Sequence, residues 1–89
     1  MRAEEVIQKV SEICKDFGAK KVILYGSRAK GTARERSDID IAVSGVKIFD
    51  ELVEEVEKLL TLYSLDIVNM DTCKNQLLLE DIRQYGREI

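Results

Sequence analysis

The hydrophobic positions along the chain follow a helical period in some segments and a strand period in others. Apolar side chains recur at helical spacing in three segments, the last of which has a capping residue at Thr72 and ends at Gly86. These segments predict helices over about residues 2–17, 47–60 and 73–85. Short runs rich in Val, Ile and Leu predict strands over residues 21–25, 38–43 and 64–70, and the polar connection after the first strand has room for one helical turn.

This order of elements predicts an α+β fold of two layers, with a small mixed β-sheet and helices packed on one face. The connection between the second and third strands holds a helix, which fits a right-handed parallel crossover. Alternation assigns Ile39, Ile41 and Val43 to the face that the helices cover. The opposite face, which has no predicted helix left to cover it, would carry Asp38, Asp40 and Asp66.

The acidic residues of the second and third strands are the candidates for chemistry. Asp38 and Asp40 lie roughly 6 to 7 Å apart along one face of a strand, and a parallel neighbour would bring Asp66 to the same end of the sheet. Three carboxylates in one place need a cation, and oxygen ligands suit Mg²⁺, here in a centre of two ions. Asp38 and Asp40 would bridge the metals and anchor a nucleoside triphosphate. Asp66 would complete the second metal site and orient, or deprotonate, an acceptor hydroxyl.

The turn after the first strand would bind the phosphates. Gly26 lets the backbone approach closely, the Ser27 hydroxyl and nearby N–H groups can donate hydrogen bonds, and Arg28 follows directly. Simpler interpretations remain open, because Ser27 could be a capping residue and Asp38 a strand-entry residue. Asp66 could pair with a lysine, although an unpaired charge in its apolar strand would cost several kcal/mol.

Composition narrows the classes of function. The 89 residues predict a single domain, and 45% hydrophobic and 35% charged residues indicate a globular chain without a membrane-spanning stretch, which we expect to be cytoplasmic. Two cysteines without histidine cannot form a zinc site. Residues 20–36 hold six basic residues against one acidic residue, whereas the remainder is strongly acidic. This asymmetry favours a ligand with several phosphates over a nucleic acid.

The motifs together resemble a known family. Gly26-Ser27, ten intervening residues, Asp38-Ile39-Asp40 and a later Asp66 resemble the signature of the DNA polymerase β nucleotidyltransferase superfamily, and most of the chain is similar to its minimal nucleotidyltransferase (MntA-like) branch. The resemblance implies the nucleotidyltransferase fold, Mg²⁺, and ATP as the donor substrate. Asn69 stands where many relatives carry another acidic residue, which leaves the proposed ligands unaffected.

The resemblance also implies a partner. Minimal members act as antitoxins of a toxin–antitoxin pair with a helical HEPN toxin, in which AMP is transferred from ATP to a tyrosine hydroxyl of the toxin (AMPylation). We therefore expect a hetero-oligomer with a HEPN partner. Two alternatives stay open: a binding module that masks its partner without turnover, and a nucleotidyltransferase that acts on a small hydroxylated molecule such as an aminoglycoside.

Overall fold

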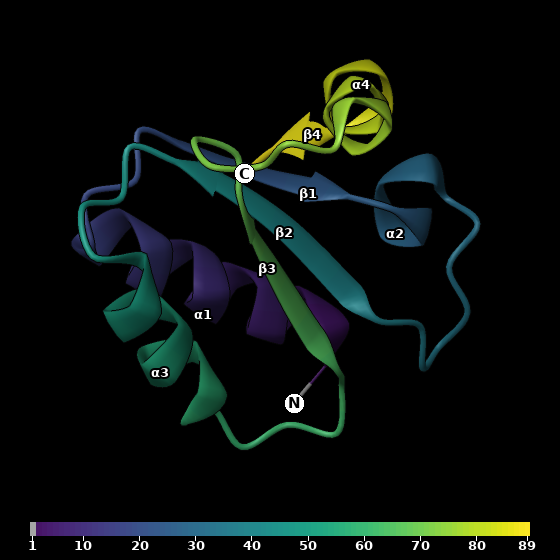
Figure 1. Cartoon of the computed structure of the whole chain (residues 1–89). Coiled ribbons are helices and arrows are strands. Elements are labelled where there is room, and N and C mark those ends of the chain that lie inside the picture. The colour runs from purple at the N-terminus through teal and green to yellow at the C-terminus, as the bar shows by residue number, and fades with distance from the viewer. Residues whose placement is uncertain (1) are drawn as a thin grey trace.

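The computed structural model describes residues 2–89, which form a mixed sheet of four strands. The strands are β1 (Lys21–Tyr25), β2 (Ile39–Ser44), β3 (Leu65–Asn69) and β4 (Arg87–Glu88), arranged in the order β3-β2-β1-β4 (Figure 1). Strand β1 is antiparallel to both β2 and β4, whereas β2 and β3 are parallel. The predicted parallel crossover is therefore confirmed.

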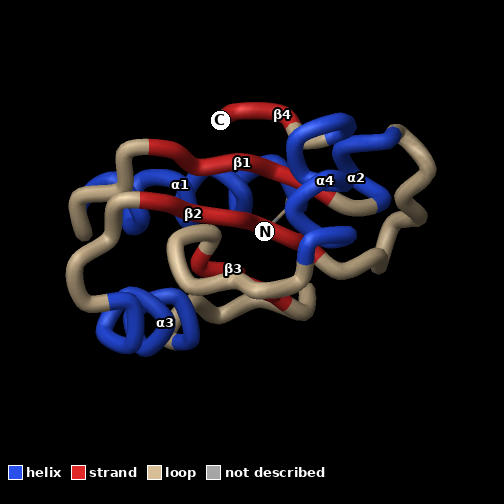
Figure 2. Tube along the Cα trace, turned by 45° about the horizontal axis from the view of Figure 1, so that its top comes forward, coloured by secondary structure: helices blue, strands red, loops and turns tan. Residues whose placement is uncertain are grey.

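Two helices, α1 (Ala3–Asp16) and α3 (Phe49–Glu57), cover one face of the sheet (Figure 2). The apolar side chains on one side of each helix pack against the inward side chains of the central strands. They share one side because apolar positions recur every three to four residues in the helices and every second residue in the strands. The fully buried part of this core consists of Val6, Val10, Cys14, Leu24, Ile39, Ile41, Val43 and Leu52. The assignment of Ile39, Ile41 and Val43 to the helix-covered face is confirmed.

The last helix, α4 (Gln76–Tyr85), corrects the expectation that the opposite face has no helix over it and that all helices pack on one face. Ile82 of α4 is 2% exposed and packs with Tyr25 and Ala42, and Leu78 joins this second, smaller cluster. The α+β class and the mixed sheet are confirmed. Helix α4 covers part of the second face because its apolar side chains need a partner surface and only that face is free.

Several boundaries differ from the sequence-based ones. Helix α3 ends at Glu57, and Leu60 lies in the following loop, 90% exposed. Helix α4 begins after Asn75, whose side chain accepts a hydrogen bond from the Leu78 N–H at 3.1 Å, so Thr72 is not the cap. The expected single turn after β1 is present as α2 (Ser27–Lys30).

The two-residue strand β4 has no counterpart in the sequence-based elements, which left residues 87–89 as a trailing end. It pairs with Ile23 and Leu24 of β1, and so makes β1 an interior strand. Two residues are too few to show a strand period, which explains why the pattern missed it.

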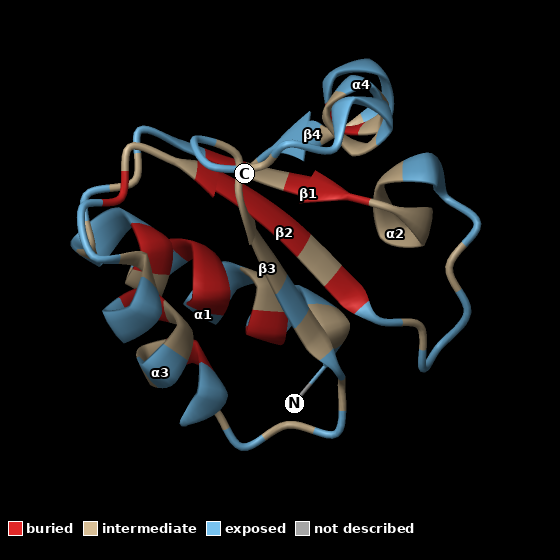
Figure 3. Cartoon of the chain, in the orientation of Figure 1, coloured by how far each residue is buried: buried red, intermediate tan, exposed pale blue. Residues whose placement is uncertain are grey.

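Burial falls across the sheet from the interior strands to its β3 edge. Strands β1 and β2 are mostly buried, whereas β3 is intermediate or exposed along its whole length (Figure 3). Among residues 2–89, none of the helices combines the length and the apolar content that a membrane crossing requires.

Candidate active site

Three side chains form a row across the sheet. Tyr25 on β1 pairs in register with Asp40 on β2, and Asp40 pairs with Asp66 on β3. Residues directly opposite on neighbouring strands project from the same face, so the tyrosine and both carboxylates lie side by side. Asp38 comes just before β2 and adds its negative charge to the surroundings of Asp40. The expected approach of Asp66 to Asp40 is present.

Gly26 brings the backbone directly against the Asp40 carboxylate. Its φ of 73° and ψ of −156° are accessible essentially only to glycine. A Cβ atom at this position would overlap Asp40 Oδ2 and lie 3.3 Å from Asp40 Cγ. Ser27 follows as the first residue of α2 and is half-buried. The predicted Gly-Ser turn thus lies next to the aspartate row.

Negative charge accumulates at Asp40 without full compensation. Burial, the charge of Asp66 and the charge of Asp38 raise the pKa of the Asp40 carboxyl above its ordinary value, and the positive charge of Arg28 opposes this rise. The pKa of the Tyr25 hydroxyl is also raised, first by burial and then by the charges of Asp66 and Asp40. Tyr25 therefore stays protonated at neutral pH beside two carboxylates.

Arg28 connects the turn to two loops. Its guanidinium donates hydrogen bonds to the Ser37 carbonyl at 2.8 and 3.2 Å and to the Glu35 carbonyl at 3.2 Å. It also lies over the Tyr63 ring, 5.1 Å from the ring centre. Arg28 thus holds the segment that leads into Asp38, and its charge reaches Asp40. Its contact with a phosphate stays a prediction.

The sequence did not identify Tyr25 or Tyr63 as parts of the site. Lys30 on α2 forms a 3.0 Å salt bridge with Asp81 on α4 and lies over the Tyr85 ring at 4.9 Å. These contacts fix the Gly-Ser turn relative to α4. The only available signal was the position of Tyr25 directly before Gly26, because its pairing with Asp40 depends on a strand register that the sequence does not display.

The acidic residues have the donor chemistry for Mg²⁺. Carboxylate oxygens are its preferred protein ligands, and the raised pKa of Asp40 reflects repulsion that a divalent cation would relieve. Within residues 2–89, however, no three acidic, cysteine or histidine side chains surround one point closely enough to form a metal site. The metal centre of Asp38, Asp40 and Asp66 therefore stays a prediction.

The polymerase beta nucleotidyltransferase family model matches residues 8–89, which include every residue of this site. The chain belongs to this family. The Gly26 turn against Asp40, and Asp66 on the next parallel strand, thus lie within a nucleotidyltransferase domain.

Two curated relatives of this nucleotidyltransferase come from Methanocaldococcus jannaschii. The first, named "Putative protein adenylyltransferase MJ1379", is 32% identical over an alignment of 89 positions, which takes in 91% of this chain and 88% of the relative. The second, named "Putative protein adenylyltransferase MJ0604", is 46% identical over 48 residues, which are 54% of this chain but only 48% of the relative. The second match thus spans about half the length of that relative.

Solved structures share the nucleotidyltransferase fold. A toxin–antitoxin crystallised with AMP-PNP superimposes with a TM-score of 0.73 at 24% identity, over 92% of this chain and 70% of that one. A crystal structure of a "putative nucleotidyltransferase" from Sulfolobus solfataricus gives a TM-score of 0.56 at 19% identity, over 94% and 76% of the two chains. At these identities the similarity establishes the fold alone.

Proposed function

We propose that this nucleotidyltransferase depends on Mg²⁺ and transfers AMP from ATP to a hydroxyl of a partner protein. The observation that carries the proposal is the row in which Asp40 and Asp66 lie in register beside the Gly26 turn. Catalytic roles for Asp38, Asp40 and Asp66 remain part of the proposal. Bound Mg²⁺ would neutralise the triphosphate and the carboxylates and polarise the α-phosphoryl group.

The chain's own residues divide the work by position. Asp38 and Asp40 would hold the Mg²⁺ that accompanies the donor, and Gly26 and Ser27 would bind the phosphates of the donor. Asp66 orients the acceptor hydroxyl and accepts its proton as the oxygen attacks the α-phosphorus. A bond forms between that oxygen and the α-phosphorus, the bond from the α-phosphorus to the β-phosphate oxygen breaks, and pyrophosphate leaves.

We further propose that the acceptor is a tyrosine of a HEPN-type toxin and that the chain is the antitoxin of the pair. The names of the two M. jannaschii relatives support protein adenylylation, and the toxin–antitoxin neighbours share the fold. The HEPN partner and the tyrosine rest on the resemblance described above. The loop residues Leu60 and Leu62, which are 90% and 92% exposed, support contact with another protein.

The test combines purified protein, ATP labelled at the α-phosphate, Mg²⁺ and the product of the adjacent reading frame. We expect label on the partner, and a loss of at least 100-fold with Asp40→Asn or Asp66→Asn. Asp16→Asn is the matched control, because it removes an exposed carboxylate at the end of α1, far from the row. Absence of labelling, or equal labelling by wild type and Asp66→Asn, would overturn the proposal.

The same exposed leucines favour one alternative, a binding module that neutralises its partner without turnover. Co-expression with the partner separates the two functions. An enzyme loses neutralisation on Asp40→Ala, whereas a binding module retains it. Mass spectrometry of the partner then shows whether the adduct of one AMP accompanies neutralisation.

A further inference from the structure

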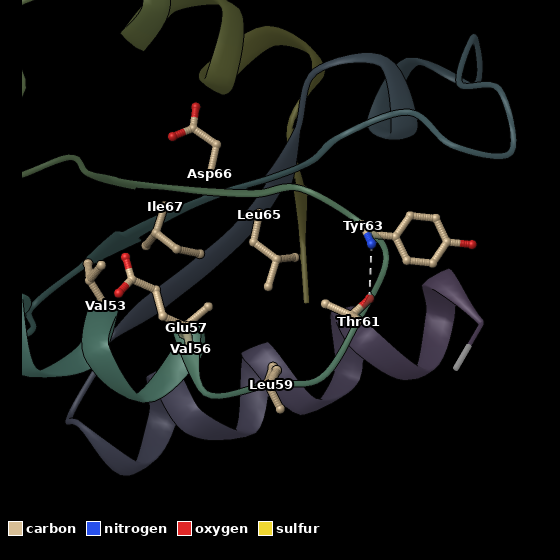
Figure 4. Close-up of a pocket in the computed structure, with 9 residues that line it drawn as sticks. All are labelled: Val53, Val56, Glu57, Leu59, Thr61, Tyr63, Leu65, Asp66 and Ile67. Carbon is tan, nitrogen blue, oxygen red and sulfur yellow. Dashed lines mark hydrogen bonds between the residues drawn. The ribbon is translucent and has the colours of Figure 1, made fainter.

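The carboxylate of Asp66 needs a group that fixes its orientation. Its side chain points away from Leu65 and Ile67, to the other side of β3 (Figure 4). Asp66 is exposed, and within residues 2–89 it forms no ion pair with a lysine or an arginine. A carboxylate that receives a proton in a transition state has to be held within a narrow range of orientations. An uncharged donor must therefore supply the orientation that an ion pair would otherwise give.

The hydroxyl of Tyr25 is the donor that reaches Asp66. Tyr25 on β1 and Asp66 on β3 flank Asp40 in the row of paired residues, so all three project from the same face. Strands β1 and β3 are two sheet spacings apart, about 10 Å, which the long side chain of a tyrosine can bridge. Burial raises the pKa of the Tyr25 hydroxyl most, and Asp66 raises it further through its charge and through a side-chain hydrogen bond. An ionised carboxylate only accepts, so the hydroxyl donates in this bond.

The ring of Tyr25 is fixed by its surroundings. Tyr25 is 6% exposed and packs with Ala42 of β2 and Ile82 of α4. A ring packed into a close-packed interior keeps one orientation, whereas an exposed aspartate side chain has several rotamers available to it. In a hydrogen bond between the two, the tyrosine therefore sets the position and the Asp66 carboxylate follows it.

We propose that Tyr25 is a positioning residue, whose hydroxyl holds the Asp66 carboxylate in the orientation that receives the acceptor proton. The hydrogen bond occupies one of the roughly four lone-pair positions of the carboxylate and leaves the others for Mg²⁺ and the acceptor hydroxyl. Tyr25 itself gives up no proton and forms no covalent bond. The inference rests on the proposed function and adds to it a residue that acts through Asp66.

Removal of single hydroxyl groups tests this role. Tyr25→Phe keeps the buried ring, so folding should persist. Tyr85→Phe is the matched control, because it removes the hydroxyl of a tyrosine on α4 that is 48% exposed and keeps the ring beneath Lys30. In the transfer assay with the product of the adjacent reading frame, we expect Tyr25→Phe to lower kcat about tenfold, at the lower end of the range for partners of metal ligands. It should leave KM for ATP unchanged, and Tyr85→Phe should change neither constant.

The separation of kcat from KM distinguishes positioning from packing. A tyrosine that only supported the fold beside Gly26 would affect how the donor binds, and its loss would raise KM for ATP. A tyrosine that orients Asp66 affects the step in which the acceptor hydroxyl loses its proton, and its loss lowers kcat. A raised KM for ATP with an unchanged kcat would overturn the inference, as would a full kcat in Tyr25→Phe.

A second measurement is independent of activity. The carboxyl carbon of Asp66 is observed by NMR at neutral pH, without nucleotide, Mg²⁺ or partner, and is assigned by its absence from Asp66→Asn. We expect Tyr25→Phe to move this resonance and Tyr85→Phe to leave it in place. An unmoved resonance in Tyr25→Phe would overturn the inference. Absence of labelling by the wild type would instead overturn the proposed function, and the carboxyl resonance decides separately whether Tyr25 holds Asp66.

Discussion

At the scale of single residues, the site depends on how closely Gly26 approaches Asp40. We expect Gly26→Ala to lower the free energy of unfolding by roughly 1–3 kcal/mol, because its backbone conformation is restricted to glycine. We also expect it to reduce nucleotidyl transfer strongly, since the new methyl group would displace the Asp40 carboxylate. Urea unfolding and the labelled-ATP assay measure the two effects.

Gly31→Ala is the matched control for this substitution. Gly31 also has a positive φ, of 77°, but a Cβ there would meet nothing within 4 Å. The control should therefore cost about 1–2 kcal/mol of backbone strain and keep its activity. Similar losses of activity in both variants would contradict the role assigned to the contact with Asp40.

The sequence was sufficient to predict some of these residues and not others. Alternation within residues 38–43 correctly separated the buried isoleucines from Asp40, because side-chain direction in a strand follows from sequence position alone. Tyr25 could not be placed in the row. Its position opposite Asp40 depends on how β1 and β2 align, and the polar connection between them leaves that alignment undetermined.

At the scale of elements, α2 acts as a support for the segment before β2. We expect Arg28→Lys to accelerate amide hydrogen exchange over residues 35–38 and to cost roughly 0.5–1.5 kcal/mol, because a lysine cannot reproduce the forked contacts to two carbonyls. Lysine keeps the positive charge near Asp40. A loss of nucleotidyl transfer in this variant would therefore be attributed to displacement of Asp38 and not to a change in charge. Exchange measured by NMR checks the prediction.

Arg34→Lys controls for the exchange of one basic residue for another in the same connection. Arg34 is exposed, and only its backbone enters the hydrogen bonds that hold Ser37. Its substitution should leave exchange over residues 35–38 unchanged. If Arg28→Lys behaved like this control, the three guanidinium hydrogen bonds would not be what orders the segment.

Element types were predictable from periodicity, whereas their ends and their faces were not. The apolar stripe of α3 continues to Leu60, but the helix stops at Glu57, and the chain returns to the sheet through a loop. For α4 the sequence analysis named Thr72 as the cap, whereas in the fold Asn75 caps the helix. Its position on the second face likewise depends on which surface remains free after α1 and α3 have packed.

At the scale of the whole molecule, ionisation of the site carboxylate Asp40 lowers the free energy of unfolding. The pKa of Asp40 is raised in the folded chain, so the folded state binds more protons than the unfolded state between the ordinary and the raised pKa. The free energy of unfolding contributed by Asp40 is therefore present at lower pH and is lost as pH rises through this window. Asp40→Asn should avoid that loss.

We accordingly expect Asp40→Asn to gain stability relative to wild type as pH increases from about 3 to 7, in the absence of divalent cations. Urea unfolding at several pH values gives the difference. Mg²⁺ at neutral pH should then stabilise wild type more than the variant, if the carboxylate helps to hold the ion. A difference that is constant with pH would show that ionisation of Asp40 does not oppose folding.

The pairing of Tyr25, Asp40 and Asp66 has a consequence for how errors in folding are avoided. If β2 slipped by one residue against β1, Asp40 would turn into the apolar core and its isoleucine neighbours would turn outward. Burying that carboxylate would cost several kcal/mol in addition to the lost burial of the isoleucines. The Asp40 carboxylate therefore also disfavours the slipped register of β2 against β1. In the favoured register Asp40 lies on the face opposite the helix-covered core.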